Sequence, residues 1–362
     1  MTACFLDGQT KAKWDLMAIG ILANYAARVR EMGSSFVALV LEAGERQLAR
    51  APRTAGMIAR WPRNVAADAV AMRFNGALHA LARSGQDPDL TALYSAQGGD
   101  FDAAIGPAMQ RSDAFIADWM RDPPQTNEVG RSAALMAALM VLRDLHDMPC
   151  ELLELGASAG LNLNLARYAY DLGGVAAGDE GSPVRIAPHW RGEAPVSRPV
   201  DVRAARGIDL HPLDVRDVAA RERLMAYIWA DEHDRLDRLD AALRLARDSP
   251  PKVDRGDIAA WLPVELAKAQ HAGSCRVVFH SMALQYLPER DRAGVDRNLA
   301  RAGESATADR PLARIALEWT EPRDAVRLLL TSWPGGETRH LATCHAYGAW
   351  IEWHGDGALV RA

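Results

Sequence analysis

The sequence predicts an α/β protein in which an all-helical N-terminal domain precedes a mainly parallel sheet, and three observations support this fold class. Up to about residue 148, apolar residues recur at helical spacing. From Glu151 onward, short apolar runs alternate with helical segments, which is typical of a parallel sheet with crossover helices. The first of these runs ends in a loop of small residues, 156–160. We therefore expect a helical lid or substrate domain at 1–148 and a sheet domain at 149–362.

The N-terminal domain is expected to contain helices separated by glycine and proline. Its helical stretches are Trp14–Met32, a helix capped by Asn64 that includes Val70, Phe74, Leu78 and Leu81, then Phe101–Met120 and Glu128–Leu145. The break before the last stretch follows from Pro123-Pro124, because proline disfavours a helical conformation in its predecessor. Asn127 is the expected cap of that helix, with Glu128 in its first turn.

The sheet domain is expected to alternate strands with helices and to end in an antiparallel ribbon. Predicted strands are Leu152–Leu155, Val184–Ala187, Ala205–Leu210, Lys252–Val253, Arg276–His280 and Leu312–Trp319. Predicted helices are Asp217–Tyr227, Asp231–Arg247, Ile258–Gln270 and Pro288–Arg301. The ribbon comprises Ala325–Ser332, Arg339–Cys344 and Trp350–His354. Gly173–Ser182 is expected to be a surface loop.

The most informative segment is the end of the first strand and the loop after it. Glu154 closes the strand, Gly156 and Gly160 bracket the loop, and apolar residues at helical spacing follow until Gly173. In a strand–loop–helix arrangement of this kind, the backbone can approach a ligand closely and the helix N-terminus faces it. We therefore expect a small-molecule site at the carboxyl edge of the sheet.

Two chemistries fit this segment. Glu154-Leu-Gly156-Ala-Ser-Ala-Gly160 resembles the acidic-x-Gly-x-x-x-Gly loop of class I S-adenosylmethionine (SAM) methyltransferases. Gly156-x-Ser158-x-Gly160 matches the nucleophile elbow of α/β-hydrolases. The dinucleotide-binding pattern Gly-x-Gly-x-x-Gly fails because residue 158 is serine. A tight turn without any ligand is the third interpretation.

The position of the loop favours the methyltransferase interpretation. A hydrolase elbow follows several strands, whereas this loop follows the first clear strand. Acids also end later strands. Asp209, or Asp214 close to it, is placed to bind a ribose diol. Asp257 follows a strand where methyltransferases bind the adenine amino group, and His280-Ser281 ends another strand at the same edge. The expected fold is thus a Rossmann-like class I methyltransferase sheet.

The chain as a whole resembles an uncharacterised bacterial family, domain-of-unknown-function family 2332. The segments that carry the resemblance are Pro124–Arg131, Glu154–Leu163, Arg206–Asp214, Phe279–Ser281 and Trp333–Glu337. The family is similar to SAM-dependent methyltransferases in its sheet, and the resemblance implies no substrate. Relatives typically carry aspartate where this chain has Ala166, so any role of that acid is lost here.

These arguments give a set of candidate site residues. Expected SAM ligands are Glu154, Gly156, Ala157, Ser158, Gly160, Asp209, Asp257, His280 and Ser281. Expected substrate contacts are Gln125, Asn127, Glu128 and Arg131, with helix capping and an ion pair as the alternative for these residues. His280 is the candidate general base, although a histidine at a strand end is equally often a hydrogen-bonded packing residue.

Composition limits the partners. Charged residues make up 25% of the chain, the net charge is −5, and arginines alternate with acids, so nucleic acid is not an expected partner. No apolar run of membrane-spanning length and no secretory signal is found, which favours the cytoplasm. No metal site is expected, because cysteines and histidines lack ligand spacing.

The leading hypothesis is a SAM-dependent methyltransferase acting on a small molecule. The alternatives are a serine hydrolase using Ser158 and a non-catalytic SAM- or nucleotide-binding module. The oligomeric state stays open.

Overall fold

The computed structural model describes residues 20–320, 323 and 325–360 of the chain. The chain divides into two compact units. One unit, here called the helical unit, comprises Met1–Thr126 and Glu222–Leu236. The other, the sheet unit, comprises Asn127–Arg221 and Asp237–Ala362. The first part of the predicted helix Trp14–Met32 lies outside the described residues.

The helical unit is built from short amphipathic helices around one apolar core. Its helices are α2 (Ile21–Glu31), α3 (Ser35–Gln47), α4 (Pro52–Ala59), α5 (Val70–Ser84), α6 (Pro88–Ala96) and α7 (Phe101–Trp119), with a 3-10 turn η1 (Leu48–Arg50). Asn64 does not cap α5 as predicted. It accepts hydrogen bonds from the backbone of Ala66 and Ala67 in a local turn, and α5 begins only at Val70.

The boundary between the units differs from the expected one at residue 148. Helix α8 (Ser132–His146) packs on the sheet and belongs to the sheet unit. The segment 222–236 belongs to the helical unit, where Trp229 and Ala230 are part of the core. Apolar helical periodicity identifies a helix but not the surface on which it packs, so the sequence does not indicate that α8 packs on the sheet. That the helical unit acts as a lid stays a prediction.

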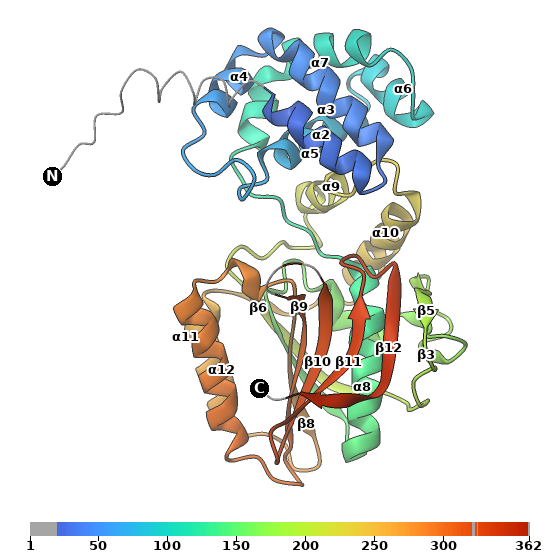
Figure 1. Cartoon of the computed structure of the whole chain (residues 1–362), viewed down its shortest axis with the longest axis vertical. Coiled ribbons are helices and arrows are strands. Elements are labelled where there is room, and N and C mark those ends of the chain that lie inside the picture. Colours follow the sequence, from blue (N-terminus) through green and yellow to red (C-terminus); the bar gives the residue numbers. More distant parts are fainter. Residues whose placement is uncertain (1–19, 321–322, 324, 361–362) are drawn as a thin grey trace, which may run out of the picture. The chain divides into compact units, whose positions relative to one another are not determined.

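The sheet unit contains a nine-stranded sheet with a parallel half and an antiparallel half (Figure 1). Its order is β5-β12-β11-β10-β9-β8-β1-β6-β7. The parallel strands are β7 (Val253–Arg255), β6 (Val202–Asp209), β1 (Cys150–Leu155), β8 (Cys275–Ser281) and β9 (Leu312–Trp319). Strands β10 (Val326–Trp333), β11 (Glu337–Cys344) and β12 (Trp350–Val360) form the predicted antiparallel ribbon. Strand β5 (His189–Arg191) pairs with the start of β12.

Helices lie on both faces of this sheet. Figure 1 shows α11 (Ile258–Ala267) and α12 (Glu289–Gly303) on one side and α8 on the other. Leu153 and Leu155 of β1 belong to a buried cluster with residues of α11 and α12. Because side chains alternate along a strand, Glu154 points to the opposite face, where α8 packs. Two further helices, α9 (Val218–Ala226) and α10 (His233–Asp248), lie in the chain between β6 and β7.

The α-helix predicted after the small-residue loop is not formed. A 3-10 helix η3 (Leu161–Arg167) is followed by a small sheet of β2 (Ala169–Asp171), β3 (Ala176–Gly178) and β4 (Arg185–Ile186). The hydroxyls of Tyr168 and Tyr170 donate to the carbonyl oxygens of Leu161 and Leu165, and Leu165 also accepts the backbone N–H of Tyr168, three residues on, as in a 3-10 helix. Strand β3 lies within the segment Gly173–Ser182, which was predicted to be a surface loop.

Candidate functional site

The candidate site lies at the carboxyl end of β1, the central strand of the parallel half. The strand order reverses there, since β6 lies on one side of β1 and β8 on the other. In open α/β sheets, a reversal of this kind leaves a crevice beyond the strand ends in which ligands bind. The predicted glycine loop, residues 156–160, begins at this point.

The loop has a left-handed backbone that explains both of its glycines. Gly156, Ser158 and Gly160 all have positive φ, at 74°, 53° and 73°. A Cβ atom on Gly156 would lie 2.5 Å from the Cβ of Ala283 in the segment after β8. A Cβ on Gly160 would lie 2.7 Å from a side-chain carbon of Val253. The loop is therefore closely packed against the segment after β8 on one side and against β7 on the other.

Asp209, a predicted ribose ligand, holds the loop to the end of β6. Its Oδ2 accepts a hydrogen bond from the backbone N–H of Ser158 at 2.8 Å, and its Oδ1 accepts from His211 at 2.9 Å. Asp214, the alternative acid, is exposed and pairs with Arg216 at 2.9 Å. Of the two acids, Asp209 is the one in contact with the loop. Each carboxylate oxygen retains capacity for a second donor.

Glu154 is the most unusual side chain of the site. It is 2% exposed, and its Oε2 atom has no hydrogen-bond partner among the described residues. Ser158 Oγ and Asn162 Oδ1 are also buried and unpartnered within that part of the chain. Buried polar atoms in native proteins are nearly always hydrogen-bonded, so a group of unpaired ones at a strand end is typical of a ligand site.

The surroundings of Glu154 favour its neutral form. Burial raises the pKa of Glu154 well above its usual 4.5, and the charge of Asp209 adds to this rise. A hydrogen bond from Asn162 and the positive charge of Arg131 act in the opposite direction without offsetting it. Sequence reasoning missed Asn162. The signal was its polar side chain in the apolar run Leu161–Leu165.

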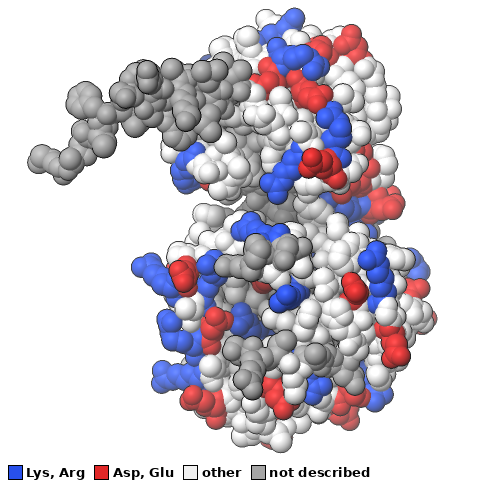
Figure 2. All heavy atoms as spheres, in the orientation of Figure 1, with Lys and Arg blue, Asp and Glu red and all other residues white. Residues whose placement is uncertain are grey.

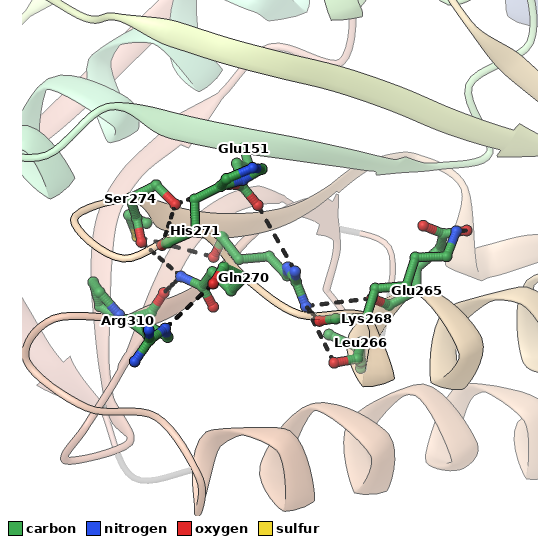
Figure 3. Close-up of polar contacts among 11 residues, drawn as sticks. Glu151, Glu265, Leu266, Lys268, Gln270, His271, Ser274 and Arg310 are labelled. Atoms are coloured by element: carbon green, nitrogen blue, oxygen red, sulfur yellow. Dashed lines mark hydrogen bonds and ion pairs between the residues drawn. The ribbon is translucent and has the colours of Figure 1, made fainter.

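The amino end of β1 carries a second buried glutamate, Glu151, with a different environment (Figure 3). Its Oε1 lies 2.6 Å from His271 Nδ1 and 2.9 Å from Ser274 Oγ, and its Oε2 pairs with Arg276 at 3.8 Å. Burial alone would raise the pKa of Glu151, but these partners lower it below its usual value. Arg276 also donates to three carbonyl oxygens at the end of α11. This network is structural.

Three of the four predicted substrate residues have structural contacts in the sheet unit. Asn127 accepts a hydrogen bond from the backbone of Leu161 at 2.9 Å, so it fixes the start of η3 rather than capping α8. Glu128 accepts from Gly130 and pairs with Arg238 at 3.7 Å. Arg131 donates to the carbonyl oxygen of Ser281 at 3.4 Å, which brings both residues to the end of β8. Gln125 lies in the helical unit.

Asp257 follows β7 as predicted and caps α11. Its Oδ1 accepts hydrogen bonds from the backbone of Ala259 and Ala260, at 2.8 and 3.2 Å. The side chain is exposed, and the preceding Gly256 donates to the carbonyl oxygen of Asp209. Asp257 therefore lies at the same edge of the sheet as the loop, with a helix-capping role of its own.

His280 is fully buried, and both ring nitrogens have partners. Nδ1 lies 2.8 Å from Glu318 Oε1, and Nε2 accepts a hydrogen bond from Arg314 Nε at 3.0 Å. Burial and the charge of Arg314 lower the pKa of His280, although Glu318 opposes this change. A general base needs a free lone pair, and the only one of the neutral ring is occupied. These contacts argue against His280 as the base.

A small pocket of about 140 Å³ lies at the opposite, amino edge of the sheet. It is lined by Leu145, His146, Leu330, Ser332, Pro334, Glu337 and Arg339. Ser332 Oγ and His146 Nε2 are 2.8 Å apart, so these two polar groups satisfy each other. The pocket contains none of the predicted site residues.

Three further observations concern partners. Among the described residues, no group of three or more His, Cys, Asp or Glu side chains is placed to hold a metal ion. No helix within the described ranges is long and apolar enough to cross a membrane. On the face shown in Figure 2, Lys and Arg lie among Asp and Glu rather than in one basic patch.

The comparisons with known proteins identify the family. The chain belongs to a family described as an uncharacterised protein conserved in bacteria, domain-of-unknown-function family 2332, whose model matches residues 21–353. This confirms the resemblance found in the sequence. Searches of curated proteins and of solved structures returned no significant match.

Proposed function

For this member of a bacterial family without an assigned activity, we propose that the β1 loop binds SAM and that the protein transfers its methyl group to a small molecule. The observation that carries the proposal is the unpaired, buried carboxyl oxygen of Glu154 at the point where the strand order reverses. An acceptor in this position suits a ligand that brings hydroxyl or ammonium donors, and SAM has both.

The sheet supports the proposal in its parallel half. Numbered along the chain from β1, the strands β7-β6-β1-β8-β9 have the order 3-2-1-4-5 found in dinucleotide-binding folds. Two features depart from a methyltransferase of class I. A 3-10 helix replaces the α-helix after the loop, so the helix-dipole contribution expected there is lost. The ribbon β10–β12 also follows β9 directly.

In this proposal, some residues of the site hold the loop in place and others bind the ligand. Asp209 and Asn127 hold the backbone of the loop and of η3, so that the loop is pre-formed before a ligand binds. Glu154 and Asn162 offer acceptor oxygens for the ligand. SAM itself supplies the activated methyl group, and the protein needs to align an acceptor with it and exclude water. Because His280 offers no lone pair, an acceptor that reacts without losing a proton first fits best.

Calorimetry with S-adenosylhomocysteine tests the proposal most simply. The wild-type protein should bind, and isotope-labelled SAM should then label a small molecule in a metabolite extract. Binding without transfer to any acceptor would favour the non-catalytic module. Absence of binding would reject the proposal.

The hydrolase alternative has one observation in its favour, the positive φ of Ser158 at the centre of its Gly-x-Ser-x-Gly pattern. Against it, Ser158 Oγ has no hydrogen-bond partner, histidine included, among the described residues. A fluorophosphonate probe separates the two functions. Labelling that disappears in Ser158→Ala would favour the hydrolase.

A further inference from the structure

A chain of polar side chains lies on the face of the sheet that α12 covers. Arg314 and Glu318 are on the same face of β9, and His280 of β8 is in register with Ala316 between them. Arg314 Nη1 in turn pairs with Asp296 of α12 at 2.6 Å. The chain therefore runs from Asp296 through Arg314 and His280 to Glu318.

These contacts determine which ring nitrogen of His280 carries the proton. Arginine is always a donor, so His280 Nε2 must be the acceptor and the ring proton must lie on Nδ1. That proton is donated to Glu318 Oε1 at 2.8 Å. Burial would raise the pKa of Glu318, but His280 and two backbone N–H groups lower it. The arrangement holds Glu318 as a carboxylate in one orientation.

Glu318 uses this orientation to hold the segment after β8. Its Oε1 also accepts hydrogen bonds from the backbone N–H groups of Ala283 at 3.0 Å and Leu284 at 3.1 Å. Met282, the residue before, has a strained φ of 58°. The Cβ of Ala283 occupies the space next to Gly156. The position of the 282–284 segment thus limits the space beside the glycine loop.

We propose that Glu318, oriented by His280 and Arg314, is a positioning residue that fixes the 282–284 segment against Gly156 and so sets the width of the ligand site. The identity of the ligand rests on the proposed function, whereas the positioning itself does not. His280 then has a part in the site without contacting the ligand.

Paired variants of the full-length protein test this inference. Histidine-to-asparagine replacement keeps a donor near the Nδ1 position, so His280→Asn should partly retain the contact with Glu318, whereas His280→Leu should lose it. Glu318→Gln keeps an acceptor oxygen and Glu318→Ala removes it. Amide hydrogen exchange at Ala283 and Leu284 reads the positioning directly. Calorimetry with S-adenosylhomocysteine reads its consequence for binding.

We expect exchange at these two amides to rise by about tenfold or more in Glu318→Ala and His280→Leu, and clearly less in Glu318→Gln and His280→Asn. Affinity for S-adenosylhomocysteine should fall in the same order, while amides of the β10–β11 hairpin stay protected. Equal exchange in all four variants would overturn the inference. If the wild type does not bind S-adenosylhomocysteine, the proposed function fails, but the exchange measurement still decides whether Glu318 positions the segment.

Discussion

Each end of β1 carries a buried glutamate, and the two differ in their hydrogen-bond partners. Glu151 and Glu154 are both buried, at 9% and 2% exposure, and only three positions apart. Glu151 is surrounded by donors from His271, Ser274 and Arg276, whereas one oxygen of Glu154 has no partner among the described residues. The difference shows that burial of a charge does not by itself identify a functional site. The unpaired oxygen is the feature that distinguishes Glu154 from Glu151 and on which the proposed ligand site rests.

The opposite pKa shifts give each glutamate a different effect on stability. The pKa of Glu151 is lowered, so its contribution is present above about pH 4.5 and is lost as the pH falls through the folded-state value. The pKa of Glu154 is raised, so ionisation destabilises the fold as the pH rises above 4.5. One end of the strand stabilises the protein at neutral pH, and the other weakens it.

The largest effect should follow from removing the partnered glutamate. Glu151→Ala leaves Arg276 without its carboxylate partner in a buried position, and we expect the free energy of unfolding to fall by about 3–5 kcal/mol at pH 7. Urea denaturation measures this change. The matched variant His271→Ala removes an exposed partner and should have a much smaller effect. Equal losses from both variants would mean that Arg276 is not the important partner.

A steric change at the carboxyl end should abolish binding. Gly156→Val places a side chain where Ala283 already lies and forces a β-branched residue to a positive φ. We expect affinity for S-adenosylhomocysteine to fall by more than about a hundredfold. Gly174→Val serves as the control, because Gly174 also has a positive φ but no neighbour within 4 Å of a Cβ. If both variants bind alike, the packing of Gly156 is irrelevant to the ligand.

Neutralising the unpaired glutamate should stabilise the unliganded protein. Glu154→Gln removes a carboxyl that ionises more readily in the unfolded chain than in the buried site, and we expect a gain of about 1–2 kcal/mol in unfolding free energy near pH 8. The gain should shrink as the pH falls and vanish below about pH 4.5, where Glu154 is protonated in both states. Urea denaturation as a function of pH measures it. A loss of stability at pH 8 would show that the interactions of Glu154 with Asn162 and Arg131 outweigh the cost of its burial.

The smallest effect should come from Asp257. As the cap of α11, it contributes about 1 kcal/mol, which Asp257→Ala should lose. Asp257→Asn keeps the capping oxygen and should retain most of this stability. If the residue also binds a ligand amino group, both variants should weaken S-adenosylhomocysteine binding by roughly ten- to a hundredfold. Weaker binding in the alanine variant alone would indicate that only the cap matters.

Local patterns predicted much of this molecule. The parallel strands, among them β9 at Leu312–Trp319, and the antiparallel ribbon follow from apolar runs and turn residues. Glu154 and the glycine loop were identified as a candidate site because strand, acid and glycines are adjacent in sequence. These features depend on neighbouring residues, which the sequence displays directly.

Features that depend on distant partners were not predicted. A 3-10 helix replaces the expected α-helix, and the hydroxyls of Tyr168 and Tyr170 donate to its carbonyl oxygens, contacts that no spacing rule indicates. His280 is a candidate base as well as a candidate packing residue in the sequence, because the sequence does not show that Arg314 and Glu318 occupy its nitrogens from the next strand. Asp257 lies where a cap and a ligand residue have the same sequence signature.

Thermal unfolding with and without saturating S-adenosylhomocysteine tests the central claim, that the carboxyl end of β1 binds a ligand and the amino end does not. Glu151→Gln should lower the melting temperature but keep the wild-type increase on adding S-adenosylhomocysteine. Glu154→Gln should raise the melting temperature of the unliganded protein and lose most of that increase. No increase in the wild type, or the same increase in all three proteins, would contradict the account.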